Sequence, residues 1–342
     1  MIISRNVEYM PFDKNGTITA CQEILTENPS HVFLTAFWEN WHPSETLQWA
    51  DNFFKHNNIP VTWIINHWSK HDIGWKKFNN PVVFVDFVLW RVYKEIVVKK
   101  KNAVNTTWNA DADQYLFLTG KPDKFQRIGL FYKLYKNDLL ENCNYSLFMN
   151  PGMMAKSKKY VPELSNEEFE SFVLQHQRNP DNICYIEQID SLHYGGIPYD
   201  PALYSTSLFR LISETHMHLR TPWPTEKTWL TILNRNPFVI AGDLGTCEYL
   251  QSRGIETFDK LFDIPTYDNI SSEHDRLDHV VAHVKQWMAG NFDKDSVADM
   301  VEKNYNRLIE LALQEKAHVE NSTGHNIDLL VDTCDFLAGE SS

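Results

Sequence analysis

The stretch from residue 204 to residue 258 most constrains the fold of this chain, because strand and helix patterns alternate along it. Thr225 belongs to the residue types that cap helix N-termini, and apolar residues follow it at helical spacing as far as Pro237. The apolar run at residues 238–241 is typical of a strand that is buried on both faces. A glycine turn, a helix closed by Gly254 and a short strand are predicted after it. Such alternation predicts an α/β fold with a parallel sheet.

The rest of the chain continues this alternation and divides near Asp111. Apolar runs of strand length predict strands at residues 31–36, 61–65, 81–87, 114–118, 145–149 and 183–186. Helical spacing predicts helices at residues 44–56, 123–140, 166–175, 276–289, 296–316 and 327–337. A length of 342 residues is enough for two domains of ordinary size. We therefore predict α/β domains at residues 1–110 and 111–342, the second with a helical C-terminus.

Composition places this chain among soluble globular proteins, with an apolar fraction of 43%. Its N-terminus has no apolar run typical of a signal peptide, and no segment approaches the roughly 20 apolar residues of a membrane span. Five scattered cysteines argue against a disulfide framework and a structural zinc site. These features predict a cytoplasmic protein without a membrane partner, and they carry no signal for an oligomeric state.

The net charge of −13 is unevenly distributed. Residues 91–159 contain 13 Lys/Arg and 6 Asp/Glu, a local charge of +7, so the remainder carries −20. The overall charge argues against nucleic acid as a partner. The local excess favours a basic strip that faces phosphates, or else a solvated face with basic helix ends.

Lys227 occupies an unusual position for a lysine, in the first turn of the helix that Thr225 begins. The positive end of the helix dipole lies there and favours an anion over a cation. A lysine beside unpaired N–H groups would bind an anion strongly, and a diphosphate is the obvious candidate. The alternative is a solvated surface lysine that is paired with Glu226.

Three short motifs in this stretch resemble a known family. They are Ser213-Glu214-Thr215, Thr225-Glu226-Lys227-Thr228, and the run from Pro237 to Gly242. In order and spacing they are similar to the nucleotide-sugar half of GT-B glycosyltransferases, in particular the fucosyltransferase-like group and related bacteriophage proteins. The resemblance implies two Rossmann-like domains that face a cleft, with the last helix, residues 327–337, crossing back to the first domain.

The same resemblance implies donor-binding roles for several side chains. Lys227 would hold the donor phosphate, and Glu214 or Glu226 would hold the ribose. Thr225 and Thr228 belong to the same motif. The co-substrate would be a UDP- or GDP-linked sugar, with no tightly bound cofactor and no metal ion.

A second phosphate site is predicted at the start of the second domain. Strand 114–118, a turn that contains Gly120 and Lys121, and helix 123–140 follow one another as in Rossmann-type units, which place backbone N–H groups under phosphate. A complete G-x-G-x-x-G motif is absent from the sequence. The resembling families carry an arginine on this helix, and Arg127 matches that place. Their turn is rich in arginine, whereas this one has lysines.

Polar residues that follow the strands of the first domain are candidates for the catalytic base. Ligands of open parallel sheets bind beyond the carboxyl ends of the strands. Glu39 follows strand 31–36, His67 follows strand 61–65, and Asp86 lies at the end of strand 81–87. Each of them could deprotonate an acceptor hydroxyl, or could have a structural role instead.

Two patterns are compatible with metal binding but are weak. His67 and His71 have the i, i+4 spacing of a helical metal pair, without an apparent third ligand. Asp111 and Asp113 form a D-x-D motif, which in another glycosyltransferase class holds a divalent cation, but here it precedes a strand instead of following one. The sequence therefore predicts no metal site.

The leading hypothesis is a glycosyltransferase that moves a sugar from a nucleotide diphosphate sugar to an acceptor hydroxyl. The resemblance to bacteriophage proteins implies a hydroxymethylated base in duplex DNA as one acceptor, which would place the enzyme in the host cytoplasm. A cell-surface glycan and a protein side chain are the other acceptors. The alternative is a non-catalytic nucleotide- or glycan-binding module on a degenerate transferase fold. A nucleotide-dependent hydrolase or ligase is disfavoured, since the sequence has no Walker-type phosphate loop.

Overall fold

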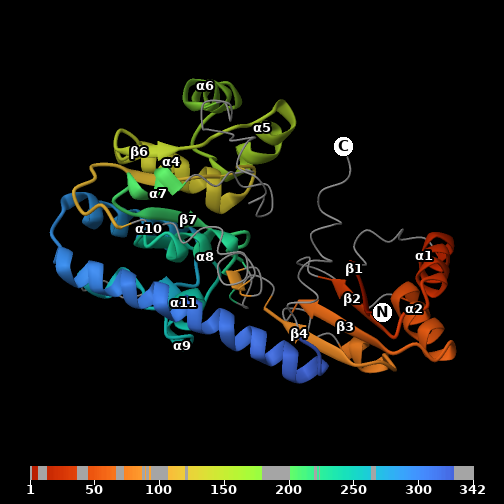
Figure 1. Cartoon of the computed structure of the whole chain (residues 1–342). Helices are drawn as coiled ribbons and strands as arrows, with labels where there is room; N and C mark the ends of the chain where they lie inside the picture. Colours follow the sequence, from red (N-terminus) through yellow and green to blue (C-terminus); the bar gives the residue numbers. More distant parts are fainter. Residues whose placement is uncertain are drawn as a thin grey trace. The chain divides into compact units, whose positions relative to one another are not determined.

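The fold comprises two compact units, each described by itself below. The computed structural model describes residues 2–6, 14–36, 45–66, 73–86, 89, 92–93, 107–119, 122–178, 201–218, 222, 224–262 and 267–326. Residues 1–103 and 309–342 belong to the first unit, and residues 104–308 form the second (Figure 1). The domain bounds predicted from the sequence, 1–110 and 111–342, stay a prediction. The units differ from them mainly in assigning residues 309–342 to the first unit.

The first unit is built on a four-stranded parallel sheet. Its strands are β1 (Ile2–Asn6), β2 (His31–Ala36), β3 (Val61–Asn66) and β4 (Val82–Val85), and they lie in chain order. The connections contain α1 (Lys14–Thr26), α2 (Glu45–His56) and the 3-10 helix η3 (Ile73–Lys77). Right-handed crossovers between strands that follow in order place the connecting helices on one face of the sheet. The core accordingly combines Ile24 of α1 and Phe54 of α2 with Leu34 and Trp63 of the strands.

Most predictions for this unit are confirmed. Strands form at 31–36, 61–66 and 82–85, and a helix forms at 45–56. The sequence provided no prediction for β1 and α1. Gly16 and the neighbouring Asn and Thr residues are poor helix formers, so α1 depends on packing against α2 and the sheet more than on local propensity.

The second unit contains another four-stranded parallel sheet, in the order β6-β5-β7-β8. Its strands are β5 (Tyr115–Phe117), β6 (Cys143–Tyr145), β7 (Arg210–Ser213) and β8 (Phe238–Ala241). The chain passes from β5 to β6 on one side and then returns to place β7 on the other side of β5. Such a reversal between β5 and β7 is a topological switch point, where α/β proteins bind ligands. The predicted mixed α/β fold with parallel sheets is confirmed.

Helices connect and cover this second sheet. They are the π-helix η5 (Phe125–Gly129), continued by α4 (Leu130–Lys136), then α5 (Pro151–Ser157), η6 (Lys158–Tyr160), α6 (Asn166–His176), α7 (Pro201–Ser205), α8 (Glu226–Leu233), α9 (Thr246–Ser252), η8 (Phe258–Phe262), η9 (Tyr267–Asn269) and α10 (Glu273–Ala289). Helix α10 packs against β8 and α4. Its Trp287 is fully buried and stacks on Phe209 with ring centroids 5.3 Å apart.

Four predictions differ from the structure or lie outside the described residues. Strand β6 overlaps the predicted strand 145–149 only at Tyr145. Residues 255–257, after Gly254, are not in a strand and lead into η8. The predicted strand 183–186 and helix 327–337 lie outside the described residues.

Helix α11 (Lys294–Thr323) belongs to both units, because residues up to Leu308 lie in the second and residues from Ile309 onward in the first. In the first unit, Glu315 accepts a hydrogen bond from the Asp86 N–H at 2.8 Å, and His318 Nε2 lies 3.0 Å from the Phe84 carbonyl oxygen. None of the helices among the described residues is long and apolar enough to cross a membrane.

Two glycines that follow helices provide a matched test of packing in the second unit. Gly254 and Gly290 both have left-handed backbones, with φ of 79° and 72°. A Cβ atom at residue 254 would lie 2.9 Å from Arg307 Nε, whereas one at residue 290 would meet no atom within 4 Å. Alanine costs about 1–2 kcal/mol at either place through backbone strain. At residue 254 it also disturbs the 2.7 Å hydrogen bond from Arg307 Nε to the Arg253 carbonyl.

We expect Gly254→Ala to lower the free energy of unfolding by about 1 kcal/mol more than Gly290→Ala does, because one buried hydrogen bond is lost in addition. Urea titration of both variants measures the difference. Equal losses would contradict the prediction and would mean that Arg307 adapts without cost.

Candidate functional site

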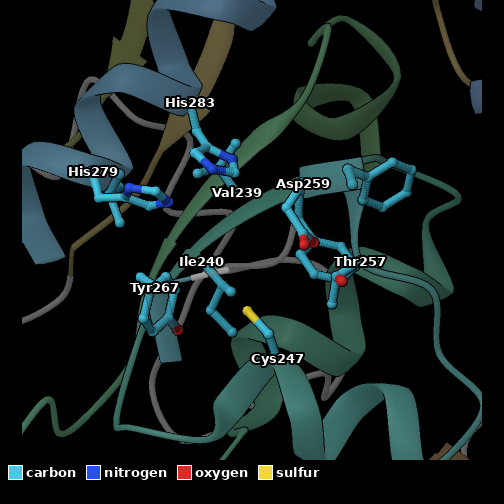
Figure 2. A pocket seen from close by; sticks show the side chains of 11 residues that line it. Val239, Ile240, Cys247, Thr257, Asp259, Tyr267, His279 and His283 are labelled. Atoms are coloured by element: carbon cyan, nitrogen blue, oxygen red, sulfur yellow. The ribbon is translucent and has the colours of Figure 1, made fainter. Parts of the chain in front are cut away.

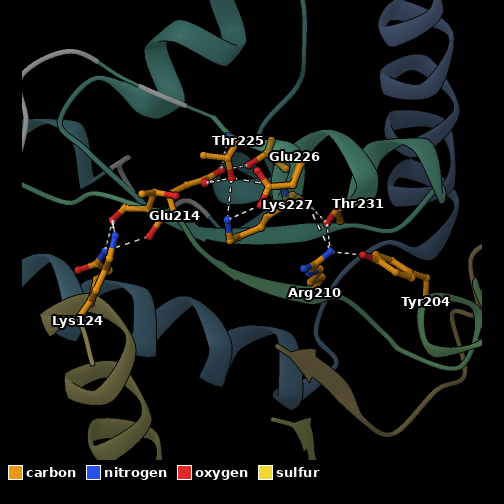
Figure 3. A network of polar contacts seen from close by, with 11 residues as sticks. Lys124, Tyr204, Arg210, Glu214, Thr225, Glu226, Lys227 and Thr231 are labelled. Carbon is orange, nitrogen blue, oxygen red and sulfur yellow. Dashed lines mark hydrogen bonds and ion pairs between the residues drawn. The ribbon is translucent and has the colours of Figure 1, made fainter. Parts of the chain in front are cut away.

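The candidate site lies at the carboxyl edge of the second sheet, where the segments after β5 and β7 meet at the switch point. Gln126 of η5 reaches across and donates from Nε2 to the carbonyl oxygens of Glu214 and Thr215, at 3.0 and 2.9 Å. Lys124 Nζ also donates to the Thr215 carbonyl at 2.9 Å (Figure 3). Ser213 Oγ donates to the Gln126 carbonyl at 3.2 Å. These four bonds fix the two segments to each other.

Glu214 organises the start of α8, which is the helix that carries Lys227. Its carboxylate is 1% exposed and accepts from the Thr225 N–H at 3.0 Å, the Thr225 hydroxyl at 2.5 Å and the Thr228 hydroxyl at 2.6 Å. An anion at a helix N-terminus is stabilised by the helix dipole and by free N–H groups. At α8 this anion position is already filled by Glu214.

Arg210 holds the same helix from the other side. It is buried at the start of β7 and donates to the Tyr204 hydroxyl, the Thr231 hydroxyl and the Lys227 carbonyl, the last two at 3.3 and 3.5 Å (Figure 3). Thr231 Oγ1 in turn donates to the Lys227 carbonyl at 2.7 Å. The backbone of Lys227 is therefore fixed by neighbours on β7 and within α8.

Lys227 is buried and paired. It is only 6% exposed, and its ammonium lies 2.7 Å from Glu226 Oε1 and 3.1 Å from Thr225 Oγ1. The alternative interpretation of Lys227 was therefore right about the Glu226 partner and wrong about a solvated position. Burial raises the pKa of Glu226, but the Lys227 ammonium and hydrogen bonds outweigh this effect, so its pKa lies below the ordinary value.

Positive charge gathers around His216, in the segment after β7. Burial, followed by the charges of Lys124, His218, Arg127 and Lys227, lowers the pKa of His216 to about 4. Its imidazole is therefore neutral at pH 7. Lys124 and Arg127 belong to the chain after β5 and Lys227 belongs to α8, so three cations from two segments contribute positive charge at one half-buried histidine.

The helices that follow β5, β7 and β8 differ in how their first N–H groups are satisfied. Glu214 accepts the N–H of Thr225, the N-cap residue of α8, and Asp268 accepts from the N–H groups of Cys247 and Glu248 at the start of α9, at 3.4 and 2.8 Å. The helix formed by η5 and α4 has no side-chain cap; its N-cap residue is Lys124, in an extended conformation. An external anion at the start of η5 therefore meets no side-chain cap, unlike one at α8 or α9.

The structure places only some of the predicted site residues. Arg127, Glu214, Thr225, Glu226, Lys227 and Thr228 are buried or half-buried in the second unit, around the switch point and the start of α8. Glu39, His67, Gly120 and Lys121 lie outside the described residues. Lys124, Gln126 and His216 were absent from the predicted site. The sequence held a signal for two of them: Lys124 lies close to the predicted phosphate turn, and His216 lies in the loop after Glu214.

Asp86 is buried in the first unit and is engaged in backbone contacts. Its carboxylate accepts from the Leu89 N–H at 3.2 Å, and its own N–H donates to Glu315. This geometry is that of a cap on the turn after β4. A role of Asp86 as catalytic base stays a prediction.

The weak metal patterns gain no geometric support. Asp111 pairs with Lys294 at 2.6 Å, which lowers the pKa of its carboxyl through a hydrogen bond and charge attraction. His67 and His71 lie outside the described residues. Within the ranges that the structure describes, no three His, Cys, Asp or Glu side chains are grouped closely enough to hold a metal ion.

No family model, no curated protein sequence and no solved structure matches this chain in the comparisons.

Proposed function

We propose that the second unit binds a nucleoside diphosphate at the switch point between β5 and β7, and that the chain is a glycosyltransferase using a nucleotide diphosphate sugar. The observation that carries this proposal is that the segment with Lys124 and Arg127 is bonded to the loop after β7, where Lys124 and Gln126 donate to the carbonyl oxygens of Thr215 and Glu214. The charges of Lys124, Arg127 and Lys227 all act on His216 in this loop. Phosphate groups are favoured where cations, an uncapped helix start and the carboxyl ends of strands coincide.

In this proposal, the diphosphate lies beside the start of η5 instead of at α8, where Glu214 occupies the anion position. We propose that the turn predicted from the sequence at Gly120 and Lys121, which lies outside the described residues, contributes backbone N–H groups. Glu226, whose side chain is 23% exposed, is the better partner for the ribose, because both carboxylate oxygens of Glu214 already accept hydrogen bonds within the protein.

The proposed reaction uses the two units differently. Cations in the second unit stabilise the charge that grows on the departing diphosphate. A residue of the first unit, Glu39, His67 or Asp86, removes the proton from the acceptor hydroxyl. We propose a GT-B arrangement, in which a cleft between two Rossmann-like domains excludes the water that would hydrolyse the donor.

A thermal-shift screen against UDP, GDP, CDP, ADP and the corresponding nucleotide sugars tests which nucleotide binds. A ligand at 100 times its dissociation constant adds about 2.7 kcal/mol to the stability of the protein, which raises the melting temperature by a few degrees. We expect a shift with one nucleoside diphosphate. The absence of a shift with every nucleotide would contradict the proposal.

Lys124→Met and Lys227→Met test the site itself. Each removes one cation from the cluster, and a charged hydrogen bond contributes about 1.5–3 kcal/mol, so we expect an affinity for the diphosphate that is about 10–100-fold weaker. Lys133→Met is the matched control, because Lys133 lies on α4 in the same unit and pairs with Asp278 at 2.5 Å. Isothermal titration measures all three. Unchanged affinity in both site variants would overturn the proposed site.

The proposed acceptor is a hydroxymethylated base in duplex DNA, which the basic segment 91–159 supports with its local charge of +7. Gel shifts with modified and unmodified duplexes at rising salt test this, since phosphate contacts weaken with salt. No binding at low salt would contradict a DNA acceptor and favour a glycan or a protein side chain instead.

A second candidate function is a nucleotide- or glycan-binding module without turnover. The capping contact of Asp86 favours it, because this carboxylate already has a structural partner. Release of nucleoside diphosphate from a donor sugar separates the two functions, since only the transferase produces it.

A further inference from the structure

A small buried cavity lies between β8 and α10 in the second unit. Its volume is about 20 Å³, and its lining comes from β8, α9, η8, η9, α10 and the segment before η8 (Figure 2). Val239, Ile240 and Val280 supply apolar walls, and Tyr267 and Cys247 lie at its border. A cavity needs roughly 10–15 Å³ to hold one water molecule, so this cavity has room for one.

Besides Tyr267 Oη, two buried polar groups of the lining, on α10 and η8, have no hydrogen-bond partner among the described residues. They are Nε2 of His283, which is 8% exposed, and Oδ1 of Asp259, which is 7% exposed. More than nine in ten buried polar groups in proteins are hydrogen-bonded, so two such atoms at one cavity require an explanation.

A third polar group completes the lining. Thr257 Oγ1 accepts a hydrogen bond from Gln251 Nε2 at 2.6 Å and still has its own hydrogen to donate. Buried waters in proteins make two to four hydrogen bonds, and polar cavities hold water where apolar ones stay dry. Asp259, His283 and Thr257 together offer this number of partners.

We propose that this cavity binds one internal water molecule that bridges Asp259 Oδ1 and His283 Nε2 and thereby joins η8 to α10. The water donates one hydrogen bond to Asp259 Oδ1 and makes a second hydrogen bond with His283 Nε2. Burial and the neighbouring His279 keep the His283 imidazole neutral at pH 7, with its pKa lowered to about 4 despite Asp259, so it has one nitrogen that donates and one that accepts.

A metal ion fits these residues less well than water. Cys247, Asp259, His279 and His283 line the cavity, yet no three of them approach closely enough to form a ligand set in the described part of the chain. Burial also raises the pKa of the Cys247 thiol well above its usual range, which disfavours the thiolate that metals bind.

A crystal structure of the full chain at a resolution that shows ordered water tests the proposal directly. We expect one density peak within about 3.2 Å of both Asp259 Oδ1 and His283 Nε2. An empty cavity, or a direct contact between the two side chains, would overturn it. Failure of this test leaves the proposed nucleotide site untouched, because that site uses other residues.

A double-mutant cycle provides a measurement in solution. We expect Asp259→Ala and His283→Phe each to change the unfolding equilibrium constant by about tenfold, which is the loss of one buried hydrogen bond. The double variant should lose clearly less than the product of the two, because either substitution alone already releases the water. Gln286→Ala is the control, because Gln286 is an exposed residue of α10 outside the cavity lining, and its effect should multiply with that of Asp259→Ala. Independent effects of Asp259 and His283 would contradict a shared water.

Discussion

Replacing Glu214 with glutamine is expected to lower the free energy of unfolding by about 3 kcal/mol. The carboxylate accepts three hydrogen bonds from Thr225 and Thr228. Glutamine keeps one oxygen and turns an NH₂ group toward hydroxyls that now donate, so the start of α8 loses its capping anion. Urea titration measures the change. Glu248→Gln, an exposed carboxylate on α9, is the control and should differ little from the wild type.

The same variant separates two roles of Glu214. We assign Glu214 a positioning role: it holds the start of α8, the helix that carries Lys227. In that case the Glu214→Gln variant should lose stability and should also show a smaller thermal shift with the nucleotide. The prediction from the resemblance to GT-B enzymes was instead that Glu214 or Glu226 contacts the ribose. Unchanged stability combined with lost nucleotide affinity would contradict the positioning role and support the ribose contact.

Replacing Asp51 with alanine is expected to destabilise the first unit by about 3–5 kcal/mol, the largest effect we foresee. Asp51 is 1% exposed and lies on α2. Its carboxylate accepts from Trp63 Nε1 at 2.9 Å, from the Asn79 N–H at 2.6 Å and from Asn80 Nδ2 at 2.8 Å. It thus connects α2, β3 and the turn before β4, and its removal leaves several buried donors without an acceptor.

Two neighbouring substitutions define what Asp51 contributes. Asn52→Ala removes an exposed amide that accepts one hydrogen bond from Asn79 at 2.7 Å, and should lower stability by less than about 1 kcal/mol. Asp51→Asn keeps the shape of the side chain but replaces an acceptor oxygen with a donor, and should fall between wild type and Asp51→Ala. Chemical denaturation measures the change in stability of each variant. A loss below about 1 kcal/mol in Asp51→Ala would show that water replaces the carboxylate.

Much of the secondary structure could be predicted from the sequence, because local patterns specify it. The runs at β2, β3 and β8 are apolar and bounded by turn residues, and Thr225 caps α8 as predicted, with its hydroxyl accepting from the Lys227 N–H. Where local signals are weak, the predictions failed. Helix α1 contains poor helix formers, and β6 has only three residues, so its position was misplaced along the chain.

The sequence by itself determined which segments form strands and helices in much of the chain, and that a parallel α/β fold results. Tertiary structure decided the order β6-β5-β7-β8 and hence the position of the switch point, because strand pairing depends on contacts between distant segments. It also decided that Glu214 fills the anion position of α8, and that the charges of three cations from two segments act on His216. Such contacts join residues that are 11 or more positions apart in the sequence, as Thr225 and Glu214 are. Local sequence patterns cannot predict them, because they form only when the sheet brings the loops together.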